Sequence, residues 1–248
     1  MIAREELLAA AVARLILDPE APPVRHIAVG AASPIPAAAC WLVKFLGHDV
    51  HLSLLHRQTG NPFTAGTREL FDLAGQGRVD LFFLGGGQID GQANTNLIGT
   101  GNWPGTHVRF PGSFGAPFMY LMVPRTILFR EEHSRRVLVP RVDIISAPGL
   151  SPPGVFRRGH ARALVTGRCV FSFKPDAGRF TLRSIHPGET LASIAQNTGF
   201  AYEADDVTPV TEPASEQELE LLRGPVCHRM QETYPAFCQR VWGLPATT

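Results

Sequence analysis

The run Val79-Asp80-Leu81-Phe82-Phe83-Leu84 constrains the fold more than any other stretch of this chain. It is apolar at nearly every position and hardly alternates, so both faces of the strand that it predicts are buried. Strands buried on both faces belong to parallel sheets that helices cover on each side. The run therefore predicts an interior strand of a layered α/β domain.

Segments with helical periodicity alternate with short apolar runs in the first third of the chain. The helical pattern covers residues 4–18, 37–45 and 67–74, and the other apolar runs cover residues 26–29 and 50–55. Strands separated by helices predict a mostly parallel sheet flanked by helices, the α/β class. Further along, we expect short strands at 119–123, 127–129 and 142–145, a β-hairpin at 163–172 and 179–185, and helices at 191–198, 215–222 and 225–242. The prediction is a single domain over residues 1–248 that ends in a β-hairpin and helices.

Composition excludes several classes of partner. The 248 residues include 23 Lys or Arg and 22 Asp or Glu, which leaves a formal net charge of +1. Without a basic stripe, the chain is not expected to bind nucleic acid. The four cysteines form no CxxC pair, so we expect reduced core thiols and no metal site. No apolar segment has the length of a membrane span and no cleavage signal follows the first helix, so we expect a cytoplasmic protein without a membrane partner.

Two loops are candidates for a ligand site, because ligands of α/β sheets bind at the carboxyl ends of parallel strands. They are Gly30–Pro34 and Gly85–Asn96. In the second loop, the glycines permit close approach of a ligand to the backbone, and polar side chains are available to bond it. Two of those side chains, Asp90 and Asn94, would equally serve to cap and close the loop. The loop matches neither a GxGxxG pattern nor a Walker A motif.

The run GGGQIDGQANTN at residues 85–96 resembles a loop of the β-type subunits of heteromeric class I CoA-transferases, and the glutaconate CoA-transferase branch is the most similar. Other segments resemble this family in the same order. Residues 29–34 are similar to its first glycine loop, 109–116 to its later Gly-rich turn, 133–149 to its basic turn and middle strand, and 170–173, 186–188 and 198–200 to its closing hairpin and helix. The resemblance covers roughly residues 5–225.

This resemblance implies a mostly parallel α/β fold and a separate α-type partner subunit, in a heterodimer or heterotetramer. It implies that coenzyme A enters as the thioester of an acyl-CoA substrate, and that no cofactor is covalently bound. In the family, a glutamate of the β-type subunit attacks the acyl carbonyl and forms an acyl-anhydride and then a glutamyl-CoA thioester. That glutamate stands at the end of the second strand.

The expected nucleophile is missing from this chain. Leu54 occupies the position of the family's glutamate, and no Asp or Glu occurs between Asp49 and Glu69. A slip of one or two positions offers Ser53 or His56 as catalytic candidates, with His56 as the local base for Ser53. A larger misalignment would make Glu69 the nucleophile, although it falls within a predicted helix.

Loss of the glutamate is typical of two branches that the resemblance brings in. One opens a ring in a CoA thioester during steroid breakdown by hydrolysis of a carbon–carbon bond, and the other decarboxylates a branched glutaconyl-CoA. A decarboxylase needs a dry apolar site, to which Leu54, Leu55 and Phe63 are the candidates. We therefore predict an acyl-CoA hydrolase or decarboxylase without a glutamyl-CoA intermediate. The alternatives are a true CoA-transferase whose carboxylate comes from elsewhere and a CoA-binding module without catalysis.

The predicted residues of the acyl-CoA site lie in three loops. Two arginines, Arg135 and Arg136, are further candidates to meet a CoA phosphate, or they form an ordinary solvated turn. Ala93 stands where the family has glycine, and we expect its backbone to stay at negative φ and to reshape the turn. The substrate-binding residues predicted from the resemblance are Gly30, Ser33, Gly85, Gly86, Gly87, Gln88, Asp90, Asn94, Asn96, Gly112 and Gly115.

Overall fold

The computed structural model describes residues 2–55, 57, 63–65 and 67–244. The chain divides into two compact units, which are described separately below: Met1–Phe83 with Glu212–Thr248, and Leu84–Thr211. Whether these units act as the one domain expected from the sequence stays a prediction. Both belong to a mixed, mostly parallel sheet flanked by helices, so the predicted α/β class is confirmed.

The first unit carries three parallel strands, β1 (His26–Val29), β2 (His51–Leu54) and the start of β3 (Leu81–Leu84). β1 lies in the middle and pairs in parallel with both of the others. All four residues of β1 and of β3 are buried, as the apolar runs predict. The helices of this unit are α1 (Arg4–Ile16), α2 (Pro34–Phe45), α3 (Thr67–Gly75), α6 (Glu216–Leu221), the π-helical turn η1 (Leu222–Val226), α7 (Cys227–Gln231) and α8 (Pro235–Trp242).

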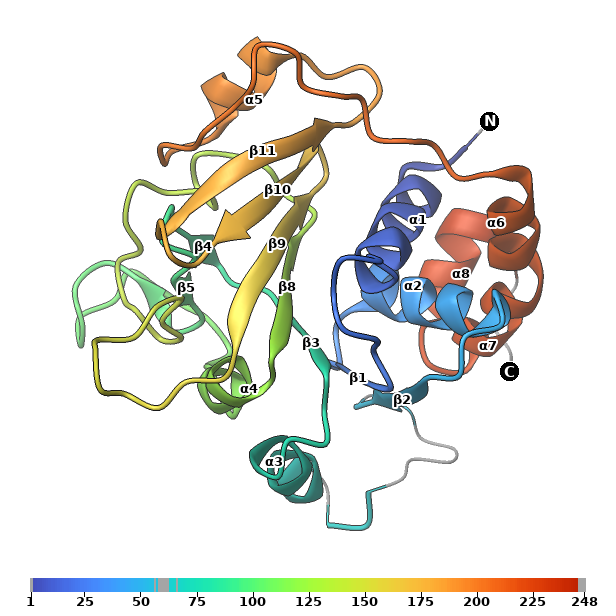
Figure 1. Cartoon of the computed structure of the whole chain (residues 1–248), viewed down its shortest axis with the longest axis horizontal. Helices are drawn as coiled ribbons and strands as arrows, with labels where there is room; N and C mark the ends of the chain where they lie inside the picture. The colour runs from blue at the N-terminus through green and yellow to red at the C-terminus, as the bar shows by residue number, and fades with distance from the viewer. Residues whose placement is uncertain (1, 56, 58–62, 66, 245–248) are drawn as a thin grey trace. The chain divides into compact units, whose positions relative to one another are not determined.

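The C-terminal helices of this unit lie beside α1 and α2, which come from the opposite end of the sequence (Figure 1). An ion pair joins these segments, since the buried carboxylate of Glu6, 2% exposed, accepts hydrogen bonds from Arg223 Nε at 2.7 Å and Nη2 at 2.8 Å. Trp242 Nε1 donates to the same carboxylate at 3.2 Å. Burial of an unpaired carboxylate would be costly, so these partners fix α1 against the C-terminal segment.

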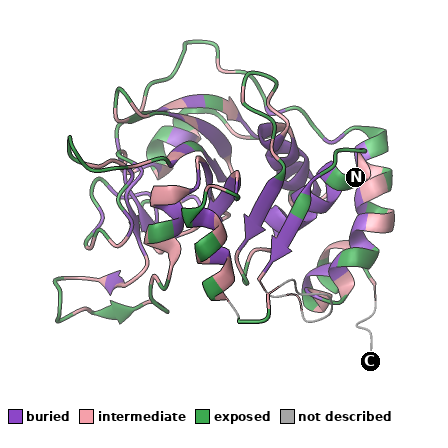
Figure 2. Ribbon diagram, turned by 60° about the horizontal axis from the view of Figure 1, so that its bottom comes forward, coloured by how far each residue is buried: buried purple, intermediate pink, exposed green. Residues whose placement is uncertain are grey.

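The second unit contains a four-stranded part of the sheet, β8 (Arg125–Arg130), β9 (His160–Thr166), β10 (Cys169–Lys174) and β11 (Arg179–Ile185). β8 and β9 are parallel, and β9, β10 and β11 are antiparallel neighbours. Most of their residues are buried (Figure 2). The remaining elements are β4 (Gln88–Ile89), β5 (Thr95–Asn96), β6 (Gly99–Thr100), β7 (Val108–Arg109), α4 (Ala116–Met122) and α5 (Leu191–Asn197).

Three of the predicted elements are wrong. Residues 119–123 are not a strand but lie at the end of helix α4, where Met119, Tyr120 and Val123 are buried with the spacing of one helix face. The predicted strand at 142–145 has no ladder, because its backbone bonds to side chains instead. The predicted single strand at 163–172 is two strands, which a turn at Gly167 and Arg168 separates.

Candidate functional site

The loop after β3 is a compact polar turn between the short strands β4 and β5. Gln88 is buried and lies at its centre: its Oε1 accepts from Asn96 Nδ2 at 2.7 Å and from the backbone N–H of Asp143 at 3.0 Å. Gln88 Nε2 donates to the Asp143 carboxylate at 3.2 Å, and that carboxylate also accepts from the Gly101 N–H at 2.8 Å. The amide of Gln88 therefore connects three segments that are far apart in the sequence.

Asp90 closes the turn that follows. Its Oδ1 accepts from the N–H groups of Gln92 at 3.0 Å and Asn94 at 3.1 Å. Its Oδ2 accepts from Asn94 Nδ2 at 3.2 Å and from the Val142 N–H at 3.3 Å. Asp90 is 3% exposed, and Asn94 in turn accepts from the Gly149 N–H at 2.9 Å. These contacts account for Asp90 and Asn94 as residues that shape the loop, and their contact with a substrate stays a prediction.

The three glycines of this loop make room for other parts of the protein. A Cβ at Gly87 would lie 2.2 Å from the ring of Phe110, and a Cβ at Gly86 would lie 2.9 Å from the Gln88 carbonyl oxygen. At Gly85 it would lie 3.1 Å from the carbonyl oxygen of Phe129. None of the three has a positive φ. Close packing therefore explains why glycine is needed at Gly86 and Gly87, whatever else binds there.

The expectation for Ala93 is wrong. Its φ is 61°, in the left-handed region that glycine favours, and its side chain is fully buried. The turn is held in this conformation from outside: Ala93 N–H donates to Asp90 O at 3.0 Å, and Tyr120 Oη donates to Ala93 O at 3.1 Å. Gly149 packs so closely on this backbone that a Cβ there would lie 2.1 Å from Gln92 O. The alanine is accommodated by strain, and the turn is not reshaped.

The Gly-rich turn at residues 112–115 lies next to this loop within the same unit. The Phe110 N–H donates to Ile98 O at 2.9 Å and the Gly112 N–H donates to Leu97 O at 3.0 Å, which sets the segment against the residues after β5. The Phe110 ring covers Gly87. Of the predicted residues, the structure thus brings together Gly87, Gln88, Asn96 and Gly112 around one side of the second unit.

The position expected for a nucleophile lies in the first unit, at the end of β2. Leu54 is the last residue of the strand and is 3% exposed. Ser53 is fully buried, and its Oγ lies 2.7 Å from Nε2 of His26. His26 Nδ1 lies 2.8 Å from the carbonyl oxygen of Arg78, which only accepts, so Nδ1 carries the hydrogen and Nε2 accepts from Ser53. Burial lowers the pKa of His26, which favours this neutral form.

This pair corrects the base assigned to Ser53. The sequence suggests His56, which lies outside the described residues, whereas the structure gives His26, on the neighbouring strand. A catalytic role for Ser53 stays a prediction, and the complete burial of its side chain weighs against such a role. The pair was missed because its residues are 27 positions apart and meet only through the parallel pairing of β1 and β2.

Glu69, the other carboxylate considered as a nucleophile, closes its own loop. Its carboxylate accepts from Thr64 Oγ1 at 2.6 Å, from the Thr64 N–H at 3.0 Å and from the Ala65 N–H at 3.2 Å. Hydrogen bonds from Thr64 lower the pKa of Glu69. Glu69 also borders a surface cavity of about 310 Å³ beside α3, together with Phe63 and His51. A capping role accounts for this carboxylate without any chemistry.

Gly30 and Ser33 form the turn between β1 and α2. The Oη of Tyr234 donates to the carbonyl oxygens of Ala31 at 2.9 Å and Gly30 at 3.4 Å, which ties this turn to the C-terminal segment. Ser33 is the N-cap residue of α2, and its side chain makes no capping hydrogen bond. Its hydroxyl is therefore not committed to the helix, and its contact with a substrate stays a prediction.

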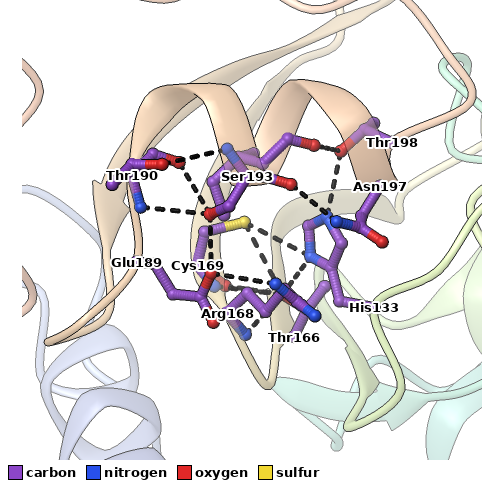
Figure 3. A network of polar contacts seen from close by, with 10 residues as sticks. His133, Thr166, Arg168, Cys169, Glu189, Thr190, Ser193, Asn197 and Thr198 are labelled. Atoms are coloured by element: carbon purple, nitrogen blue, oxygen red, sulfur yellow. Dashed lines mark hydrogen bonds and ion pairs between the residues drawn. The ribbon is translucent and has the colours of Figure 1, made fainter.

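A second polar network in the second unit was not predicted from the sequence (Figure 3). His133 lies between two hydroxyls, with Nδ1 2.8 Å from Thr166 Oγ1 and Nε2 3.0 Å from Thr198 Oγ1. Burial, and then the charge of Arg168, lower the pKa of His133 to about 4, so the ring is neutral at pH 7. Cys169 Sγ lies 3.7 Å from His133 Nδ1, but burial raises the pKa of this thiol to about 12. The Cys–His pair is therefore structural, because a nucleophilic cysteine needs a lowered thiol pKa.

The two arginines considered for a CoA phosphate have partners within the protein. Arg136 forms an ion pair with Glu132 through its Nη2, and its Nε donates to the same carboxylate at 3.2 Å. Arg135 Nε donates to the carbonyl oxygen of Gln196 at 3.0 Å. Their remaining donors leave phosphate contact as a prediction.

Within the described ranges, no group of three or more His, Cys, Asp or Glu side chains is arranged to hold a metal ion. No helix in the described part of the chain combines the length and apolar character of a membrane span.

Comparison with known proteins gives a consistent set of relatives. The family model described as Coenzyme A transferase matches residues 42–197. The chain is 32% identical over 155 residues to the β subunit of 3-oxoadipate CoA-transferase from Pseudomonas knackmussii, and the match covers 59% of this chain and 58% of that protein. It is 31% identical over 160 residues to the cholesterol ring-cleaving hydrolase IpdB subunit of Rhodococcus jostii, with 63% of this chain and 62% of that protein covered. The matched part thus spans less than two thirds of these relatives.

Solved structures agree over more of the chain. The decarboxylase AibA/AibB superposes with a TM-score of 0.76 at 25% identity over 90% of this chain and 94% of that chain. Glutaconate coenzyme A-transferase from Acidaminococcus fermentans superposes with a TM-score of 0.78 over 98% of both chains, and its 19% identity supports the fold alone.

Proposed function

The chain belongs to the coenzyme A transferase family, and from this membership we propose that it is the β-type subunit of a heteromeric enzyme that acts on an acyl-CoA thioester without a glutamyl-CoA intermediate. The similar proteins support such a subunit, because their names describe one subunit of an enzyme or a pair of different subunits. The proposed partner is an α-type subunit, in a heterodimer or heterotetramer. Coenzyme A enters as part of the substrate, no cofactor is covalently bound, and the protein acts in the cytoplasm.

Leu54 is the observation that carries this proposal. It ends β2, where the family resemblance expects the attacking glutamate, and its side chain is buried. The preceding hydroxyl, that of Ser53, is also buried and bonded to His26. The carboxylate of Glu69 closes its own loop. The acyl group therefore stays on coenzyme A during the reaction.

The reaction that fits best is decarboxylation or hydrolytic carbon–carbon cleavage of the acyl group. Both build negative charge next to the thioester carbonyl, and fixed hydrogen-bond donors stabilise such charge without reorganisation. The loop around Gln88 and Asp90 is held by many internal bonds, so its backbone supplies a preorganised wall. Leu54, Leu55 and Phe63 would supply the apolar surface that favours loss of a carboxylate.

The proposed contacts of the substrate are the ones that the resemblance implies. They lie in the turn after β1, in the loop after β3 and in the turn before α4. The residues are Gly30, Ser33, Gly85, Gly86, Gly87, Gln88, Asp90, Asn94, Asn96, Gly112 and Gly115.

A trapping experiment tests the proposal. The chain, co-expressed with its α-type partner, is incubated with acyl-CoA substrates and then treated with hydroxylamine or borohydride, and its peptides are analysed by mass spectrometry. We expect no modified Asp or Glu, while a family transferase treated in parallel acquires the label on its glutamate. A labelled carboxylate anywhere in this chain would refute the proposal.

A true CoA-transferase is the second candidate, and the 32% identity to the β subunit of 3-oxoadipate CoA-transferase favours it. It predicts ping-pong exchange of coenzyme A between an acyl-CoA and a free carboxylic acid. Carbon dioxide release or ring opening without such exchange would exclude it.

A further inference from the structure

Phe114 adopts a backbone conformation that suits glycine and not a bulky aromatic residue. Its φ is 42°, and the following Gly115 has φ −90° and ψ 4°. The Ala116 N–H donates to Ser113 O at 2.8 Å, which closes a four-residue turn around them. A positive φ at the first central residue followed by these angles is the pattern of a type II′ turn, in which that position favours glycine. The phenylalanine is therefore strained.

The ring of Phe114 gains little from burial to offset this strain. It is 81% exposed, whereas Met119 and Tyr120 on the next helix are buried. An exposed aromatic residue contributes little hydrophobic stabilisation, because most of its apolar surface stays in contact with water. A residue with both a strained backbone and an exposed ring is more costly to the fold than glycine would be. Such strain in a native structure is a reason to look for a functional role.

The position of the turn indicates what the ring serves. Gly112 is bonded to Leu97, directly after β5, and the neighbouring Phe110 covers Gly87 of the loop after β3. Phe114 thus stands beside the loop that we propose to hold the acyl-CoA, in the same unit. Its ring offers an apolar face, where the loop itself offers mostly backbone and amide groups.

We propose that Phe114 determines specificity by contact of its ring with the acyl group of the substrate, and that it selects acyl groups with a bulky apolar part, branched or cyclic. This inference rests on the proposed function, since it needs an acyl-CoA at that loop. A small acyl group would not reach the ring, so its binding would not depend on Phe114. The strain of the turn is then the cost of placing an aromatic face at a fixed position.

Binding measurements on the complete complex with its α-type partner test this role. Dissociation constants are measured by calorimetry for cyclohexanecarbonyl-CoA, acetyl-CoA and free coenzyme A. For Phe114→Gly we expect about tenfold weaker binding of cyclohexanecarbonyl-CoA and changes within about twofold for the other two. We also expect an unchanged or higher melting temperature, because glycine relieves the strain.

Phe156→Ala is the matched control, because Phe156 is 70% exposed in the same unit and has no positive φ. It should leave all three constants unchanged. Equal weakening of all ligands by Phe114→Gly, no weakening at all, or loss of the α-type partner would overturn the role of Phe114. A wild-type complex that binds neither thioester would refute the proposed function itself, and the specificity role with it.

Discussion

Replacement of Asp90 by Asn tests whether the loop after β3 is held mainly by one carboxylate. Both oxygens of this side chain accept hydrogen bonds, from Gln92 and Asn94 at one oxygen and from Asn94 and Val142 at the other. All the donors are N–H groups, and Asp90 is 3% exposed. The site therefore requires an acceptor at every contact. Asparagine has the same shape but presents an NH₂ group in place of one oxygen.

The magnitude follows from the contacts that are lost. An NH₂ group in place of Oδ2 would face Asn94 Nδ2 and the Val142 N–H, at the present distances of 3.2 and 3.3 Å, and neither would have an acceptor. Hydrogen bonds to a charged acceptor contribute about 1.5–3 kcal/mol each, and buried donors left unpaired add a desolvation cost. The two bonds at Oδ2 are long, so we expect a loss near the lower bound for the pair, about 3 kcal/mol in the free energy of unfolding.

Urea unfolding monitored by circular dichroism measures this loss, with Asp206→Asn as the control. Asp206 is exposed in the same unit, so its replacement should change the free energy of unfolding by less than about 0.5 kcal/mol. Hydrogen exchange should show faster exchange of the Val142 amide in Asp90→Asn. If both variants unfold at the same urea concentration, the loop is not held by this carboxylate and our interpretation of its contacts is wrong.

Two further predictions concern the packing and titration of the second unit. Gly149→Ala places a Cβ about 2.1 Å from Gln92 O, a backbone atom that has little room to move, so we expect a loss of more than about 3 kcal/mol or insoluble protein; normal urea stability would contradict this. Burial lowers the pKa of His133 to about 4 from its ordinary 6.5. Between these values the unfolded chain binds the proton more readily, so stability should fall by on the order of 2 kcal/mol as the pH falls from about 6.5 to about 4. His133→Gln should flatten that part of the profile, and an unchanged slope would refute the assignment.

Local sequence signals were sufficient for the elements that depend on neighbours in the chain. The hairpin of β10 and β11 was predicted from two apolar runs around a turn, and Gly178 in that turn has a φ of 62°. The start of α5 was predicted from Thr190, and its side chain accepts from the Ser193 N–H at 3.1 Å. Both signals act over a few residues, so the rest of the fold does not override them.

The candidate site was predictable only as a set of loops. The amides and the carboxylate at residues 88–96 marked a polar turn, but their partners, such as Asp143 for Gln88, lie 55 residues away. The base next to Ser53 was missed for the same reason, since His26 reaches it across two paired strands. The short apolar run at 119–123 fits a strand as well as a helix, and packing selected the helix.

The sequence by itself determined the α/β class, the family and the absence of a carboxylate at Leu54, because these follow from residue order and local pattern. Only the tertiary structure decided the backbone of Ala93 and Phe114, which the local preference of each residue would place at negative φ. At Ala93 the contacts that hold the left-handed turn come from Asp90, Tyr120 and Gly149. Interactions between distant segments can offset a local conformational cost, and no local pattern shows where they do so.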